Sequence, residues 1–160
     1  MIKDIHLLIK MRRSVHWMTI AEAAETFGIS TQEYRLIEKY EEDIATRVPI
    51  GTVKKIFDFY GLDFFNMLDL DCAFCNLEKR YRPEYQLPRN ELVRFLRLEL
   101  NMDEEDLADK IGIYDEAFEW LEGDPDFLEN EHVNDIYDLA GILYVPPQLL
   151  FGVKCLDCHR

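Results

Sequence analysis

The sequence predicts an all-α protein made of two tandem five-helix units. Short segments place apolar residues at helical spacing, and no segment sustains the apolar–polar alternation of a β-strand. Each half of the chain contains five such segments in the same order. With 160 residues, of which 48% are hydrophobic, the chain is long enough to form two small packed cores.

In the first unit we expect helices over residues 5–15, 19–27, 30–39, 49–60 and 63–70. Thr19 is a predicted N-cap of the second helix, and Ser30 or Thr31 caps the third. Gly28 supplies the turn between these two helices, because glycine tolerates a positive φ without strain.

In the second unit the expected helices cover residues 90–100, 103–111, 114–121, 130–143 and 146–151. A segment with two prolines separates the units, and we expect it to be extended. The predicted organisation is therefore a first unit over residues 1–77, a linker over 78–89 and a second unit over 90–160.

An internal duplication explains this repeated plan. At a shift of 84 residues Arg13 aligns with Arg97, Gly28 with Gly112, and Glu38 with Glu122. After a deletion of one residue the shift becomes 83, which pairs Val53 with Ile136. The C-x-x-C pairs at 72–75 and 155–158 are also 83 residues apart.

Charge is distributed unevenly. The chain has a formal net charge of −14, with a net −2 in residues 1–80 and a net −12 in residues 81–160. The total counts against a protein wrapped in nucleic acid, and the asymmetry indicates different electrostatic roles for the two halves. Without a long apolar run or a signal-peptide pattern at the N-terminus, the sequence predicts a cytoplasmic protein that does not interact with membranes.

Both units resemble the lambda-repressor-like (Cro, XRE) helix-turn-helix family. The resemblance is carried in the first unit by MTIAEAAETFGIS at 18–30 and LIE at 36–38. In the second unit it is carried by MDEEDLADKIGI at 102–113 and LEG at 121–123. It implies that Arg13 pairs with Glu38, and that Arg97 pairs with Glu122, so that these arginines tie the first helix to the third. It also implies DNA binding, transcription regulation and a homodimer. The alternative to a homodimer is that the internal duplication already supplies the two-fold.

The family's DNA-facing positions correspond in the first unit to Ile20, Thr31, Gln32 and Leu36. Gln32 can form a bidentate contact with adenine, and Thr31 can contact a base or a phosphate. Ile20 and Leu36 depart from the polar side chains that usually read DNA in the family. Nearby basic residues are expected to neutralise phosphates; these are Arg35, Lys39, Arg47, Lys54 and Lys55. A protein surface with ordinary charges is the competing interpretation.

In the second unit the same four positions are acidic or aromatic; they are Glu104, Asp115, Glu116 and Trp120. An acidic helix in the major groove would be repelled by phosphates, so we do not expect this unit to bind DNA. Trp120 with its neighbours Asp115, Glu116 and Glu119 is a predicted protein-docking site. The alternative is that Trp120 packs against the first unit and the carboxylates form a solvated face.

The four cysteines predict a structural zinc site. Two C-x-x-C turns supply the four thiolates of a tetrahedral site, which are Cys72, Cys75, Cys155 and Cys158. Free thiols are the main alternative, and the pairs can also meet between two chains. Haem attachment at Cys155–His159 and a redox dithiol fit the sequence poorly, because the chain has no export signal and no thioredoxin-like βαβ pattern.

The predicted function is a DNA-associated regulator, in which the first unit contacts DNA and the acidic second unit binds a protein partner or pairs subunits. The alternative is a protein-interaction module that does not bind DNA, such as a DNA-mimic inhibitor or an antitoxin-like partner of a nucleic-acid-binding protein. Four scattered histidines and the absence of a phosphate loop or nucleophile elbow give no reason to expect an enzyme.

Overall fold

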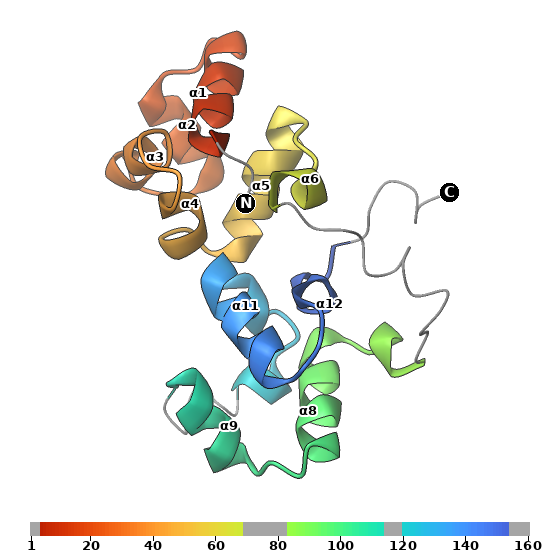
Figure 1. Cartoon of the computed structure of the whole chain (residues 1–160). Coiled ribbons are helices and arrows are strands. Elements are labelled where there is room, and N and C mark those ends of the chain that lie inside the picture. Colours follow the sequence, from red (N-terminus) through yellow and green to blue (C-terminus); the bar gives the residue numbers. More distant parts are fainter. Residues whose placement is uncertain (1–3, 69–82, 114–119, 154–160) are drawn as a thin grey trace. The chain divides into compact units, whose positions relative to one another are not determined.

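A computed structural model describes residues 4–68, 83–113 and 120–153, apart from the side chains of Met67 and Pro83. Every element in these ranges is a helix, which confirms the predicted all-α fold (Figure 1). The chain divides into two compact units, residues 1–70 and 71–160. Sequence analysis placed the end of the first unit at residue 77. Among the described residues, no helix is long and apolar enough to cross a membrane.

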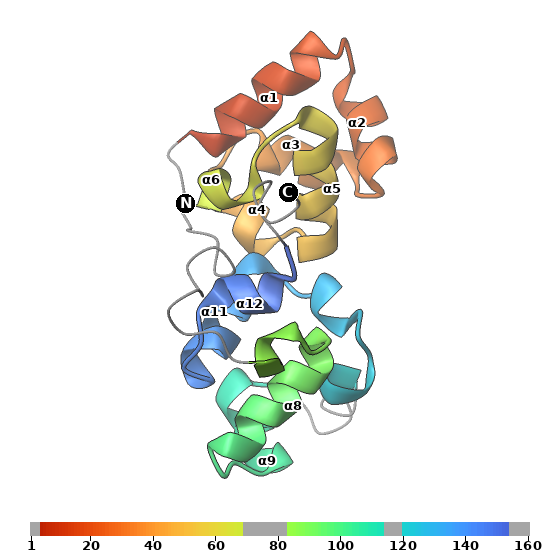
Figure 2. The ribbon, with the colours of Figure 1, turned by 90° about the vertical axis from the view of Figure 1, so that its right-hand side faces the viewer.

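Unit 1 contains six helices within its described residues. They are α1 (Ile5–Val15), α2 (Ile20–Phe27), α3 (Thr31–Ile37), α4 (Asp43–Thr46), α5 (Ile50–Tyr60) and α6 (Phe64–Leu68). α5 contacts α1 and α2, and α3 contacts α2 and α4 (Figure 2). The core is formed by the inner faces of these helices and includes Ile9, Phe27, Tyr34, Val53 and Phe57.

Local signals explain where α2 and α3 begin and end. Thr19 accepts a hydrogen bond from the Glu22 amide, and the Glu22 carboxylate accepts one from the Thr19 amide. Ser30 and Glu33 form the same reciprocal capping box at the start of α3. Between the helices Gly28 adopts a φ of 72°, the left-handed conformation in which glycine avoids the strain of a side chain. The predicted bounds of α1 and α2 are confirmed, but α3 ends at Ile37, two residues earlier than expected.

Unit 2 contains η2 (Pro83–Gln86), α8 (Arg89–Glu99), α9 (Glu104–Ile111), η3 (Phe127–Glu129), α11 (Val133–Ile142) and α12 (Pro147–Phe151). Residues 120–123 are also helical, whereas most of the predicted helix 114–121 lies outside the described residues. α11 contacts α9 and α12, and α8 contacts η2 and η3. The core includes Leu92, Leu107, Leu121, Ile136 and Leu150.

The predicted extended linker is partly helical. Its described residues include the 3-10 helix η2, which packs on α8, and Arg89, which begins α8. The Arg89 guanidinium donates a 2.6 Å hydrogen bond to Glu129 and lies against Gly152, where a Cβ atom would come within 2.9 Å of it. This end of the predicted linker is therefore part of unit 2.

Candidate nucleic-acid interface

α3 is held by a two-pronged ion pair at its C-terminal end. Arg13, on α1, donates from Nε to Glu38 Oε1 at 2.5 Å and from Nη2 to Glu38 Oε2 at 2.9 Å. Its Nη1 donates to the carbonyl of Met18 at 2.7 Å, which also fixes the residue before α2. Glu38 is 7% exposed, so water screens the pair little. The hydrogen bonds with Glu38 raise the pKa of Arg13. The implied pairing of Arg13 with Glu38 is confirmed, and its role is structural.

The inner face of α3 rests on an aromatic cluster. Tyr34 is fully buried, stacks on Phe27 with ring centroids 6.0 Å apart, and shares a 2.7 Å hydrogen bond with the hydroxyl of Tyr60. Burial raises the pKa of both tyrosine hydroxyls above the usual range, so both remain protonated. α3 is thus anchored from α1, α2 and α5.

The outer face of α3 carries the predicted DNA-reading residues. Thr31, Gln32 and Arg35 are exposed on α3, with Arg35 one turn along the helix from the other two, and Lys39 is exposed in the turn that follows the helix. Lys39 also lies over the ring of Tyr40, with its Nζ 4.7 Å from the ring centroid. The result is an exposed face with two cations and two hydrogen-bonding side chains, which we call the α3 outer face.

The remaining predicted positions are less available. Ile20 and Leu36 are half-buried, so they act at least in part as packing residues. Arg47 is exposed but pairs with Asp43 at 3.1 Å. Lys54, on α5, is half-buried and already has an interaction partner, whereas Lys55 is exposed. Of Arg47, Lys54 and Lys55, only Lys55 is an exposed cation without an ion pair among the described residues.

Unit 2 repeats the contacts that Arg13 makes in unit 1. We call such an arginine, with its glutamate and its methionine carbonyl, the arginine clamp. Arg97 donates to Glu122 from Nε at 2.7 Å and from Nη2 at 3.0 Å, and its Nη1 donates to the carbonyl of Met102 at 2.9 Å. A longer contact of 3.4 Å joins it to Glu104. The pairing implied for Arg97 and Glu122 is confirmed. The same three contacts, at the same separations along the chain, support an internal duplication, which stays a prediction.

The predicted docking site of unit 2 is only partly described. Trp120 is 62% exposed, as expected for an anchor available to a partner. Asp115, Glu116 and Glu119 lie outside the described residues.

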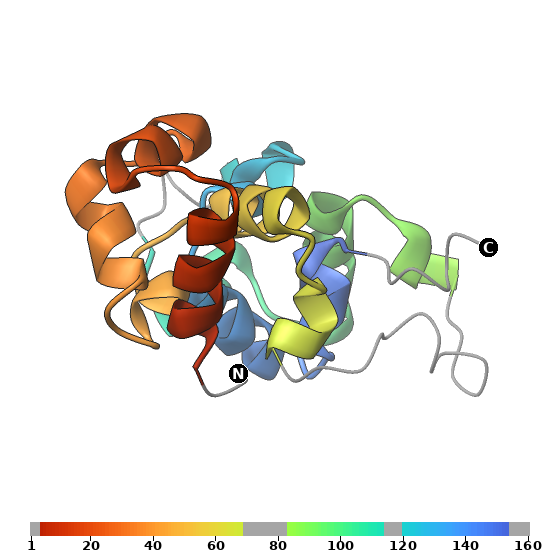
Figure 3. The ribbon, with the colours of Figure 1, turned by 90° about the horizontal axis from the view of Figure 1, so that it is seen from above.

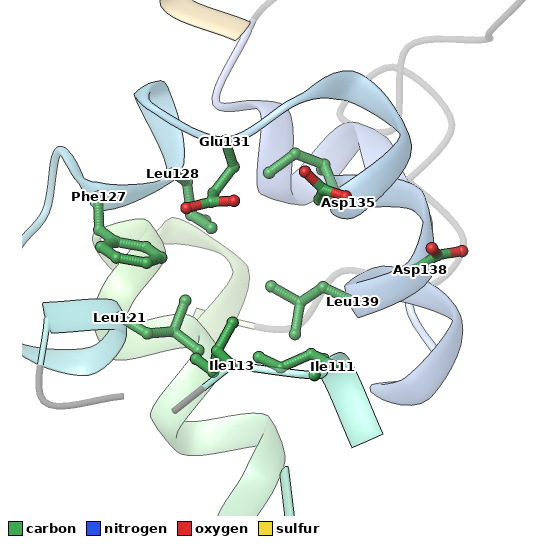
Figure 4. Close-up of a pocket in the computed structure, with 11 residues that line it drawn as sticks. Ile111, Ile113, Leu121, Phe127, Leu128, Glu131, Asp135, Asp138 and Leu139 are labelled. Atoms are coloured by element: carbon green, nitrogen blue, oxygen red, sulfur yellow. The ribbon is translucent and has the colours of Figure 1, made fainter. Parts of the chain in front are cut away.

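A pocket of about 250 Å³ lies beside this region (Figure 4). Its floor is apolar and includes Ile111, Ile113, Leu121, Phe127 and Leu139. Carboxylates of Glu131, Asp135 and Asp138 also line it, and those of Glu131 and Asp135 lie over the floor in Figure 4. Sequence analysis did not find this pocket.

Glu131 is the unusual residue of the pocket. It stands two residues before α11, where unit 1 has the fully buried Val48 two residues before α5. Burial, and then the charge of Asp135, raise the pKa of Glu131. Within the described residues Glu131 forms neither a hydrogen bond nor a salt bridge, and His132 beside it opposes the shift of its pKa only in part.

The predicted zinc ligands, Cys72, Cys75, Cys155 and Cys158, lie outside the described residues. The described part of the chain holds no cluster of three or more His, Cys, Asp or Glu that suits a metal ion. The zinc site therefore stays a prediction from the C-x-x-C spacing alone.

Comparison with known protein families, with curated proteins and with solved structures finds no match to this chain.

Proposed function

We propose that unit 1 is a DNA-binding helix-turn-helix domain of the lambda-repressor-like kind, and that the protein is a DNA-associated regulator. The observation that carries the proposal is the α3 outer face, where Thr31, Gln32 and Arg35 are exposed together on a helix anchored from behind and Lys39 is exposed in the turn that follows it. An anchored helix holds such side chains in one register against a duplex, which direct readout requires.

Each residue of this face has a distinct role. Gln32 has the amide that pairs with both hydrogen-bonding groups of adenine in the major groove, and Thr31 reaches a base edge or a phosphate. Arg35 and Lys39 neutralise phosphates, with Lys55 as a further contact from α5. The number of cations is small, so we expect modest affinity with a shallow salt dependence.

Unit 2 does not share this role in the proposal. Where the α3 outer face has Thr31, Gln32 and Arg35, unit 2 has Asp115, Glu116 and Glu119, and the position of Lys39 is Gly123. Carboxylates at three of these four positions repel phosphate, and the fourth position has no cation to offset them. We propose that unit 2 binds a protein partner through exposed Trp120 and its acidic neighbours.

A second candidate function is a protein-interaction module without DNA binding, possessing an acidic face that occupies a nucleic-acid-binding protein. It is favoured by the carboxylate-lined pocket of unit 2, and by the half-buried Ile20 and Leu36 at two of the four reading positions. The two functions differ in which unit makes the contact that matters.

Capture of genomic fragments by the full chain, followed by sequencing, tests the first proposal. Discrete enriched sites that persist at physiological salt are the expected result. Capture at low salt that is lost at physiological salt indicates contact with phosphates only. No capture at low or at physiological salt rejects DNA binding.

Paired variants then assign the unit. Gln32→Ala with Arg35→Ala is expected to reduce affinity for an enriched site about 10- to 100-fold, because each good base contact contributes about 1–3 kcal/mol. Charge reversal of Glu116 and Glu119 is the matched control on unit 2 and leaves DNA affinity unchanged under the first proposal. Under the second candidate function, the control variant loses capture of a basic partner.

The zinc prediction has its own test. Metal analysis of freshly purified protein is expected to find one zinc per chain, and chelation is expected to lower the melting temperature, because metal binding contributes directly to folding. Protein purified without metal contradicts it.

A further inference from the structure

α1 has a second apolar face that stays exposed among the described residues of unit 1. Its inner residues Ile5 and Ile9 are fully buried, whereas Leu7, Met11 and Val15 are 51%, 52% and 62% exposed. The spacing of these three residues is i, i+4, i+8, so they form a line along the helix. Figure 3 shows α1 in front of the other helices of its unit.

The equivalent helix of unit 2 shows that the fold does not require this face. α8 carries the matching clamp arginine, Arg97, and 84 residues after Leu7 and Val15 it has the exposed glutamates Glu91 and Glu99. Exposed glutamates are what a helix normally presents to water. At the middle position α8 has the half-buried Phe95, so in unit 2 glutamates replace both ends of the apolar line.

Trp17 stands in the turn after the C-terminal end of α1, two residues after Val15. Its φ is 58°, a left-handed conformation that a bulky residue rarely adopts, and its side chain is 93% exposed. Asn101 occupies the equivalent position with a φ of 52°, and asparagine tolerates this conformation well. An exposed tryptophan in this conformation therefore does not stabilise the fold. We call Leu7, Met11, Val15 and Trp17 the α1 outer face.

The charge around this face is positive in a protein of net charge −14. α1 contains Lys10, Arg12 and Arg13 and no acidic residue, and Arg13 alone is committed to the clamp. Lys10 is exposed, and the Nε of Arg12 is buried with no hydrogen-bond partner among the described residues. Lys10 therefore offers positive charge to carboxylates at the edge of the α1 outer face, and the partly exposed guanidinium of Arg12 adds to it.

We propose that the α1 outer face docks an acidic amphipathic helix of a partner protein. The apolar stripe of that helix packs along Leu7, Met11 and Val15, and Trp17 closes one end of the contact. Carboxylates beside the stripe pair with Lys10 and Arg12. A second copy of this chain fits less well, because it would bring Lys10 and Arg12 against themselves, and an anionic membrane repels a chain of this net charge.

Trp17 fluorescence in the full chain reports the contact. Trp120→Phe leaves Trp17 as the single tryptophan, whose emission is that of a ring in water. The probe is a synthetic helical peptide of about 20 residues with a leucine stripe flanked by glutamates, a length at which isolated helices become stable. A peptide with lysine in place of each glutamate is its control.

The acidic peptide is expected to shift Trp17 emission to shorter wavelength with saturation, and added salt is expected to weaken the binding. The double variant Leu7→Glu, Val15→Glu, which copies α8, is expected to lower the affinity at least about tenfold. These positions are exposed, so the variant should keep its helical circular dichroism and melting temperature. A matched variant, Glu25→Gln on the exposed side of α2, should bind normally.

Four results overturn the proposal. One is no spectral shift with the acidic peptide, and another is equal binding of the lysine peptide. The third is self-association of the chain in analytical ultracentrifugation that the double variant abolishes, which assigns the face to a second copy. Binding of anionic but not neutral vesicles through these residues also contradicts it. None of these outcomes depends on whether unit 1 binds DNA.

Discussion

Units 1 and 2 share an internal clamp but differ in almost every surface position compared above. Arg13 and Arg97 each donate hydrogen bonds to a glutamate and to a methionine carbonyl with the same geometry. On the α3 outer face, by contrast, unit 1 has polar and basic residues where unit 2 has acidic ones. The two units thus share interior contacts that stabilise the fold, whereas their exposed positions differ in charge. A substitution of an interior residue therefore tests stability, and a substitution of an exposed residue tests binding.

The largest expected effect comes from the clamp. Arg13→Ala leaves Glu38 buried without its partner, and Arg97→Ala does the same to Glu122, so each is expected to lower the free energy of unfolding by about 3–5 kcal/mol. Thermal denaturation followed by circular dichroism measures both. If either variant has the melting temperature of the natural protein, the clamp of that unit does not contribute to stability, although both clamps have the same geometry.

Tyr34→Phe tests a polar contact that belongs to unit 1. Unit 2 has Leu143 at the position of Tyr60, so the buried hydroxyl pair has no equivalent there. Removing the Tyr34 hydroxyl leaves that of Tyr60 buried and unpaired, at a cost of about 1–2 kcal/mol in chemical denaturation. The double variant Tyr34→Phe, Tyr60→Phe should recover part of the lost stability. A double variant that is less stable than Tyr34→Phe alone contradicts this account.

Trp17→Asn gives unit 1 the residue that unit 2 has at the same turn. Relief of the left-handed conformation is expected to raise the free energy of unfolding by about 1 kcal/mol. Differential scanning calorimetry measures the change. A lower melting temperature would mean that Trp17 contributes to folding after all.

Glu131→Gln has the smallest expected effect, less than about 1 kcal/mol, because the carboxylate is only partly buried. Its pKa is higher in the folded chain than in the unfolded one, so the natural protein loses stability as pH rises through the folded pKa. The variant should melt higher at neutral pH, and this advantage should shrink as the pH falls below that pKa. Parallel melting curves over the acid range provide the measurement, and a constant difference contradicts the assignment.

Sequence reasoning located the elements that carry their own boundary signals. Thr19 and Gly28 mark the ends of α2 within one turn of the helix, so its bounds follow from local chemistry. α4 and η3 span only four and three residues, too few for a helical period to be visible, and both were missed. The predicted extension of α3 to Lys39 failed because the chain turns after Ile37, with Lys39 and Tyr40 both donating to the carbonyl of Leu36.

The candidate site was predictable where it depends on one helix face, and not where it depends on packing. Gln32 and Arg35 follow a recognisable cap, so their exposure on α3 could be expected. α1 has apolar residues at Leu7, Leu8, Ile9 and Met11, and the sequence alone does not tell which of them face the core. The burial of Glu131 likewise depends on residues distant in the chain, which meet only in the folded unit.

Under the proposed function, unit 1 binds DNA through α3 and unit 2 does not. Fluorescence anisotropy with a captured genomic site, at physiological salt, tests it with the triple variant Thr31→Asp, Gln32→Glu, Arg35→Glu, which gives α3 the outer face of unit 2. We predict that the natural chain binds the site and that the variant, folded by circular dichroism, loses binding by at least about 100-fold, since three contact positions become repulsive. Unchanged affinity in the variant would show that the α3 outer face does not contact DNA, and would contradict the assignment of roles to the two units.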